Sequence, residues 1–144
     1  MGKENLEIIK KSLDVDKLLE MLNAALSEEW LAYYQYWVGA RLVAGPMRPS
    51  VEQELLVHAQ EELGHADLLI DRIIQLDGTP VLSPEDWFKL ARCKYFPPKD
   101  EYIVSILKDN LSGERCAIER YQEIANYTFG KDHATYKLAT QILE

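Results

Sequence analysis

The chain has 144 residues, of which 47% are hydrophobic and 28% charged, the composition of a globular protein long enough to bury one core. Its formal net charge of −8 argues against general affinity for nucleic-acid phosphates, which needs Lys and Arg, so DNA binding is not expected. No run approaches the roughly 18 apolar residues of a membrane span, and the first residues have no apolar core like that of a signal peptide. We therefore expect a single cytoplasmic domain over residues 1–144 and no contact with a membrane.

Long segments with helical periodicity, separated by Gly and Pro, follow one another along the chain. Asp14 or Asp16 can cap the free amides of the first helix, and Ser50 those of the second. Gly45-Pro46 ends the first helix and Gly78 ends the second, because these residues favour helix termini. The predicted helices span about residues 14–44, 50–77, 100–130 and 132–144.

The connections between these helices are short, long and short. Ser83-Pro84 opens a short helix inside the long connection, with Ser as the cap and Pro at the first helical position, and Pro97-Pro98 ends that segment. This order predicts an all-α fold, a ferritin-like four-helix bundle with a long crossover that carries a short extra helix. The fourth helix is still helical in character at Glu144, so we expect it to be truncated at the end of the sequence given.

Core-facing positions in a bundle recur every three to four residues, and each stripe found here is apolar at its ends and carries Glu near its middle. A buried carboxylate without a partner is unfavourable, and several converging carboxylates also repel one another. A bound cation would relieve both effects. The stripes consist of Leu18, Leu22, Ala25, Glu29, Ala32 and Tyr36; Val51, Leu55, His58, Glu62, His65, Leu69 and Leu76; and Ile103, Leu107, Asn110, Glu114, Ala117, Tyr121 and Ile124.

Glu62-Leu-Gly-His65 places a carboxylate and an imidazole three residues apart on the second helix. Side chains at this spacing are neighbours, with Cβ atoms roughly 5–6 Å apart, and together they can bind one transition-metal ion. A single such motif is also common on solvated helix faces. Because Glu61 is adjacent to Glu62, the row of core-facing residues could also be shifted by one position, with Glu61 facing inward. His58 is expected to be a histidine of the seam or its edge rather than a ligand.

Two halves of the chain repeat the same spacing. Glu29 and Glu114 are each followed seven residues later by a tyrosine, Tyr36 or Tyr121, which is two helical turns along the same face. Glu62 follows Glu29 by 33 residues, and Glu144 follows Glu114 by 30 residues. The second half would need a histidine three residues beyond Glu144, so either the sequence continues or the second imidazole is absent.

A Glu from each of two helices and a Glu-x-x-His from each of the other two is the di-iron carboxylate pattern. We expect Glu29 and Glu114 to be terminal ligands, Glu62 and Glu144 to bridge two ions, and His65 to be a terminal nitrogen ligand. These donors suit iron or manganese, and Zn could substitute. The expected reaction is the two-electron oxidation of an iron pair by hydrogen peroxide or dioxygen.

Tyr36 and Tyr121 are expected to donate hydrogen bonds that orient the ligands. The spacings of these tyrosines and of the carboxylates resemble the intrasubunit ferroxidase site of bacterioferritin, and the chain resembles the ferritin-like superfamily along its whole length. The short helix in the crossover resembles that of the Dps mini-ferritins.

Cys93 and Cys116 are too few for a disulfide framework and indicate packing or redox chemistry. Together with the carboxylate and histidine positions above, this cysteine pair makes the chain resemble the Dps-like proteins, or thioferritins, of archaea and some bacteria. The resemblance implies a homo-oligomeric, dodecameric hollow cage that consumes hydrogen peroxide while it oxidises and stores iron, protecting against oxidative stress. It also implies a reversible disulfide close to the iron, whose thiols supply electrons to the site or report peroxide.

Two other classes of function stay open. A rubrerythrin-like peroxidase or a manganese catalase would turn over peroxide without storing mineral, and its assembly would be a dimer rather than a cage. A helical interaction module without metal chemistry would have Glu29, Glu62 and Glu114 pointing to solvent.

Overall fold

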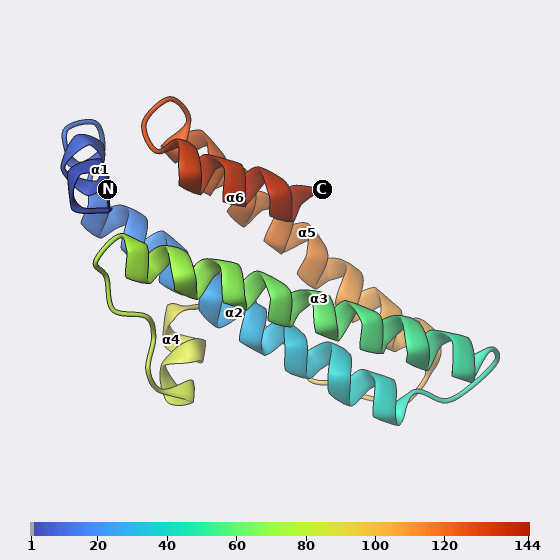
Figure 1. The fold of residues 1–144 in the computed structure, drawn as a ribbon. Helices are drawn as coiled ribbons and strands as arrows, with labels where there is room; N and C mark the ends of the chain where they lie inside the picture. Colours follow the sequence, from blue (N-terminus) through green and yellow to red (C-terminus); the bar gives the residue numbers. More distant parts are fainter. Residues whose placement is uncertain (1) are drawn as a thin grey trace.

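The computed structural model describes residues 2–144, and helices make up most of that range (Figure 1). The helices α2, α3, α5 and α6 form the bundle, and α1 packs at one end of it. In chain order the elements are α1 (Gly2–Lys10), α2 (Val15–Leu42), α3 (Arg48–Gln75), the 3₁₀ turn η1 (Pro84–Asp86), α4 (Trp87–Leu90), α5 (Ile103–Thr128) and α6 (His133–Leu143).

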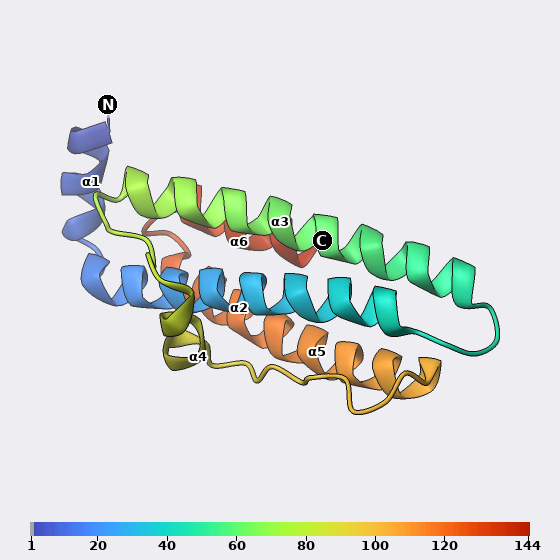
Figure 2. The same ribbon diagram turned by 90° about the horizontal axis from the view of Figure 1, so that it is seen from below.

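Two antiparallel hairpins, α2–α3 and α5–α6, pack side by side, and the segment between them runs along the bundle (Figures 1 and 2). This crossover carries η1 and α4, and Trp87 stacks on Trp30 of α2 with ring centroids 5.6 Å apart. At its far end the Ala44 N–H donates to the Glu101 carbonyl at 2.8 Å. The predicted all-α bundle with a long crossover and a short extra helix is confirmed. Within the described residues, no helix is both long and apolar enough to cross a membrane.

Several predicted helix ends are shifted by a few residues. Asp14 caps α2, accepting hydrogen bonds from the Asp16 and Lys17 amides at 3.0 and 3.3 Å. The prediction that Ser50 caps the next helix is wrong, because α3 already begins at Arg48 after Met47, which has a left-handed φ of 60°. Proline fits the first turn of α3, since amides there need no partner within the helix.

The end of α3 is a Schellman motif in which Asp77 and Gly78 donate to the carbonyls of Ile74 and Ile73, each at 2.9 Å. Asp77, the residue before Gly78, adopts a left-handed φ of 59°. Gly78 packs closely against α2, and a Cβ atom there would force the end of the Leu19 side chain to move. The glycine therefore lets the end of α3 approach α2 closely.

The core consists of two apolar clusters along the bundle. The larger one lies near α1, whose Leu6 and Ile9 are buried in it, although the sequence analysis predicted no helix there. The smaller one lies at the opposite end, around Leu55. Two positions predicted to face the core are exposed: Leu107, at 43%, whose neighbour Ile106 is buried instead, and Glu114, whose side chain is 47% exposed. The carboxylate positions lie between the two clusters.

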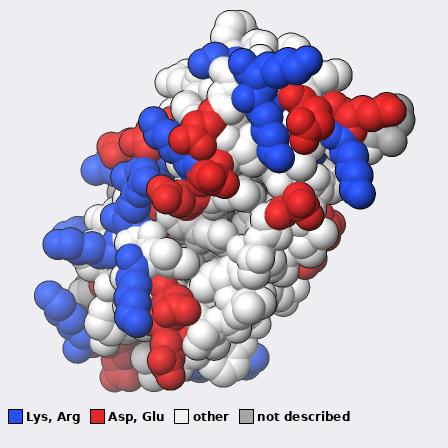
Figure 3. Space-filling model, turned by 90° about the vertical axis from the view of Figure 1, so that its left-hand side faces the viewer, with Lys and Arg blue, Asp and Glu red and all other residues white. Residues whose placement is uncertain are grey.

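Charged side chains of both signs lie next to one another on the end of the molecule seen in Figure 3. A broad area without charged residues lies beside them on the same face. Positive and negative charges are therefore interspersed on this end.

Candidate metal centre

Glu29 of α2 and Glu62 and His65 of α3 come together between the two apolar clusters. One potential ligand atom from each lies within 4.8 Å of the others. The His65 Nδ1 atom is 3.5 Å from Glu29 Oε2 and 3.4 Å from Glu62 Oε2. Helical spacing in α3 and the antiparallel packing of α2 against α3 therefore bring together three of the residues that the sequence analysis selected.

Glu29 is the most buried member of this group, with 4% of its surface exposed. Its Oε1 atom accepts a hydrogen bond from the Tyr121 hydroxyl, whereas Oε2 has no hydrogen-bond partner among the described residues. Burial, and then the nearby carboxylate of Glu62, raise the pKa of Glu29 well above its ordinary range. A buried carboxylate oxygen without a donor is an unfavourable arrangement that a bound cation would relieve.

Interactions within the group also shift the pKa values of the other two residues. The carboxylates of Glu29 and Glu62, 3.5 and 3.4 Å from His65 Nδ1, raise the pKa of His65 to about 10. Burial acts to raise the pKa of Glu62, but its interactions with the nearby Glu29 and His65 side chains outweigh burial and lower it. A metal ion bound here would compete with protons for these side chains, because metals bind deprotonated ligands.

Glu114 of α5 is placed beside this group but is not one of the three. Its Oε1 atom accepts a hydrogen bond from the Tyr36 hydroxyl at 2.6 Å and lies 3.6 Å from His58 Nδ1. Its side chain is 47% exposed. The predicted tyrosine-to-carboxylate hydrogen bonds are present, but each crosses between helices: Tyr36 bonds Glu114, and Tyr121 bonds Glu29. Their role in orienting ligands stays a prediction.

A small cavity of ≈ 60 Å³ adjoins these residues and is lined by Glu29, Glu62 and Glu114. Residues 93–95 of the crossover form part of its wall. Glu144 is exposed after the last turn of α6 and is not part of the three-residue group, so its role as a bridging ligand stays a prediction.

The family model described as the ferritin-like domain matches residues 19–144. The chain belongs to the ferritin-like family. A long crossover and a group of carboxylates and histidine between two hairpins agree with this family's bundle.

Relatives of this ferritin-like chain include proteins of two named kinds. The DNA protection during starvation protein of Pyrococcus furiosus is 35% identical over 99% of this chain and 78% of that protein. The bacterioferritin of Rhodobacter capsulatus is 34% identical over 77% of this chain and 63% of that protein.

Two solved structures have the same fold. A dodecameric thioferritin of Bacteroides fragilis, a bacterioferritin-related protein, is 59% identical with a TM-score of 0.96, covering 98% of this chain and 84% of that chain. The Dps protein of Thermosynechococcus elongatus is 20% identical with a TM-score of 0.84, covering 89% of this chain and 82% of that chain. The latter likeness concerns the fold alone.

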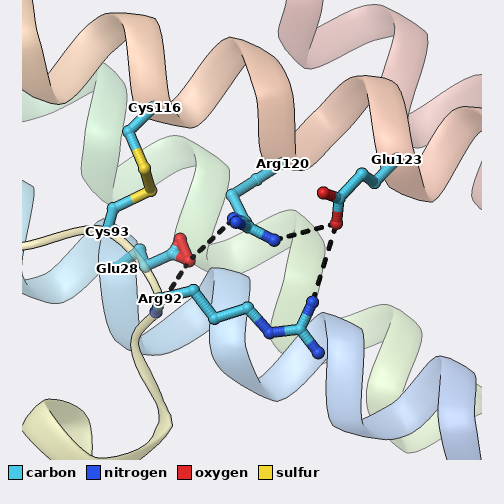
Figure 4. Close-up of a disulfide and its surroundings, with 6 residues drawn as sticks. All are labelled: Glu28, Arg92, Cys93, Cys116, Arg120 and Glu123. Atoms are coloured by element: carbon cyan, nitrogen blue, oxygen red, sulfur yellow. Dashed lines mark hydrogen bonds and ion pairs between the residues drawn. A yellow bond between two sulfur atoms is a disulfide. The ribbon is translucent and has the colours of Figure 1, made fainter.

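A disulfide joins the crossover of the ferritin-like chain to α5 (Figure 4). It connects Cys93 and Cys116, whose Cα atoms are 5.8 Å apart. Cys93 also lines the small cavity. The two cysteines, for which packing and redox chemistry were both open, are therefore paired in the structure, while the reversibility of the bond stays a prediction.

The burial of Glu28 was not predicted from the sequence, because of the two adjacent residues Glu28 and Glu29 only Glu29 was expected to face inward. The Glu28 carboxylate accepts a hydrogen bond from the Arg92 backbone N–H at 3.3 Å and lies 3.9 Å from Arg120 Nε, as Figure 4 shows. Burial raises the pKa of Glu28 to about 6, against the lowering effect of the Arg92 amide. Glu123 pairs with both arginines, at 3.6 and 2.8 Å. The disulfide and Glu28 together fix the crossover beside the candidate site.

Replacing both Cys93 and Cys116 by serine is expected to lower the free energy of unfolding by roughly 3 kcal/mol, the chain-entropy value for a disulfide across a segment of this size. Urea denaturation without reductant measures this loss. Wild-type protein treated with a dithiol should match the double variant, and each single serine variant should too. Equal stability of the oxidised wild type and the double variant would contradict a structural role for the bond.

Proposed function

We propose that this chain is an iron-storing ferroxidase that oxidises Fe(II) with hydrogen peroxide or dioxygen and thereby protects against oxidative stress. The observation that carries the proposal is the convergence of Glu29, Glu62 and His65 within 4.8 Å, with one buried Glu29 oxygen left without a donor. Carboxylates without a ligand would be expected at the surface, because burial of an uncompensated charge is unfavourable.

The donor set fits ferrous iron as a substrate. Carboxylate oxygens and an imidazole nitrogen suit Fe(II), and also Mn(II) or Zn(II). Glu29, Glu62 and His65 would hold one ion, and Glu114, which lines the same cavity, would serve a second together with Glu144. The position of Glu144 in such a pair is an inference from the repeated spacing.

The proposed reaction conserves atoms and electrons. Two Fe(II) ions give one electron each to one hydrogen peroxide molecule, the O–O bond breaks, and two protons from solvent complete two waters. The negative charge of Glu29 and Glu62 offsets the charge gained by the two ions. Tyr121, which donates to Glu29, and Tyr36, which donates to Glu114, keep two carboxylate oxygens in fixed orientations.

The cysteine pair would supply a second source of electrons. Two thiols that form the Cys93–Cys116 disulfide release two electrons and two protons, which is the amount that reduces one hydrogen peroxide to two waters. We expect the double serine variant to consume less peroxide per iron than the reduced wild type.

We also propose that copies of the chain assemble into a hollow, dodecameric cage that stores the oxidised iron. The thioferritin of Bacteroides fragilis, described as dodecameric, is 59% identical over almost the whole chain, which supports this assembly. Large apolar side chains such as Leu82, Phe88 and Phe129 are exposed in the single chain, and contacts between copies would cover surfaces of this kind.

Two alternative functions differ in what they require. A helical interaction module would have Glu29, Glu62 and Glu114 facing solvent. Glu114 is 47% exposed, but the burial of Glu29 and Glu62 weighs against this alternative. A rubrerythrin-like peroxidase or a manganese catalase would use the same residues without storing iron. The size of the assembly distinguishes them, because a dimer favours these enzymes and a dodecamer favours storage.

The test is anaerobic addition of Fe(II) followed by hydrogen peroxide or dioxygen, with Fe(III) absorbance recorded over time. We expect rapid absorbance growth that exceeds the protein-free rate and continues beyond two irons per chain, in a particle of about twelve subunits by sedimentation. A protein that oxidises no faster than buffer, or saturates at two irons as a dimer, would contradict the proposal.

A further inference from the structure

The side chain of Asn110 on α5 has a polar group that the proposed iron site does not use. Asn110 is 7% exposed, and its Nδ2 donor has no hydrogen-bond partner among residues 2–144. An unpartnered buried donor is unfavourable, so a small molecule that carries an oxygen lone pair, water included, is expected to accept a hydrogen bond from it.

The orientation of the Asn110 amide follows from its neighbours. The Phe96 backbone N–H donates to Gln35 Oε1 at 3.1 Å, and a backbone N–H can only donate. Gln35 must therefore direct its Nε2 group away from Phe96, and that group donates to Asn110 Oδ1 at 2.9 Å. The Asn110 oxygen is thus occupied, and its Nδ2 donor is the group left free.

Asn110 lies at the boundary between two cavities. It lines the ≈ 60 Å³ cavity beside Glu29 and a more open cavity of ≈ 460 Å³ beside His58. Tyr36 and Glu114, joined by their 2.6 Å hydrogen bond, line both cavities as well. A small molecule that passes between the two cavities would therefore meet the Asn110 amide next to the carboxylates.

The ≈ 60 Å³ cavity is also lined by one hydrogen-bond acceptor and one donor that have no partner. Glu29 Oε2 is an acceptor without a donor, and Asn110 Nδ2 is a donor without an acceptor. The acceptor favours a cation, and the donor favours a molecule with an exposed oxygen lone pair. The surrounding carboxylates repel anions, so the second molecule is expected to be neutral.

We propose that Asn110 donates a hydrogen bond to hydrogen peroxide and holds it beside the carboxylate group. This inference rests on the proposed ferroxidase function and names the oxidant that the cavity selects. Hydrogen peroxide is small, neutral and a good hydrogen-bond acceptor, whereas dioxygen accepts hydrogen bonds weakly and gains little from the amide. The binding step transfers no electrons; the two Fe(II) ions supply both, as in the reaction above.

The test replaces Asn110 by alanine in the assembled protein. Loss of one hydrogen bond is expected to raise the KM for hydrogen peroxide about threefold to tenfold. This rise should exceed any change in kcat and in the rate with dioxygen. Titration with Co(II), followed by its visible absorption, should report the same metal affinity as in the wild type. Asn126→Ala, an exposed position on the same helix, is the matched control and should leave all four quantities unchanged.

Each outcome supports or overturns the inference. If Asn110→Ala does not fold, Gln35→Leu removes the group that orients the amide and should raise the same KM by a smaller factor. An unchanged KM in a protein that still oxidises Fe(II) overturns the role of Asn110 but leaves the proposed function standing. An equal reduction of the oxidation rate with dioxygen, or weaker Co(II) binding, overturns the role of Asn110 as well, since Asn110 would then only support the structure of the site. If the wild type oxidises no Fe(II), the proposed function and this inference both fail.

Discussion

Replacing Glu62 by alanine is expected to slow the rapid phase of Fe(II) oxidation by at least roughly 100-fold, the upper range for loss of groups that merely support a metal ligand. Glu62 lies on the same face of α3 as His65 and contacts it at 3.4 Å, so its removal leaves Glu29 and His65 alone in the group. Stopped-flow absorbance after anaerobic loading of Fe(II) measures the rate.

The adjacent Glu61 provides the matched control for this experiment. Its side chain is 56% exposed and contacts His58 rather than the three-residue group. Glu61→Ala should therefore oxidise Fe(II) at the wild-type rate. Undiminished rapid oxidation in Glu62→Ala, or an equal loss in Glu61→Ala, would show that the site lies elsewhere.

Replacing Asp132 by alanine is expected to lower the free energy of unfolding by about 3–5 kcal/mol, because it leaves Arg72 as a buried charge without its partner. Asp132 is 2% exposed, and its Oδ1 atom lies 2.9 Å from Arg72 Nη2. It also accepts a hydrogen bond from the Thr135 amide at 3.1 Å and so caps α6. Urea denaturation measures the loss.

Two comparisons separate the buried charge from other effects. The double variant Arg72→Met, Asp132→Leu removes both charges and should be less destabilised than Asp132→Ala. Lys10→Ala removes the exposed 3.6 Å pair with Glu7 and should change stability by less than about 1 kcal/mol. A small effect of Asp132→Ala, close to that of Lys10→Ala, would contradict the prediction.

The spacing of helical residues was sufficient to predict the centre of the site. Glu62 and His65 share a face because they are three residues apart, and Glu29 meets them because α2 and α3 are antiparallel with a short connection. The fold class followed from helix lengths and from the long connection. These features depend on periodicity, which a single sequence contains.

Features that depend on the rotation of one helix against another could not be predicted in the same way. Leu107 was expected in the core, yet Ile106 is buried, because a rotation of α5 by one residue exchanges the two. The same limit applies to Glu28, which is buried through its contact with the Arg92 amide of the crossover. The path of an irregular segment is set by such tertiary contacts, and its sequence has no periodicity to indicate them.

The location of the three-residue group on a single hairpin has a consequence for motion. Glu29, Glu62 and His65 belong to α2 and α3, whereas their neighbours Tyr121 and Glu114 belong to α5 in the other hairpin. A breathing motion that slides one hairpin against the other would thus keep the three donors together while it lengthens the hydrogen bond from Tyr121 and shifts Glu114. Binding of one ion and binding of an ion pair would then respond differently to temperature, since only the pair requires the two hairpins to keep a fixed position relative to each other.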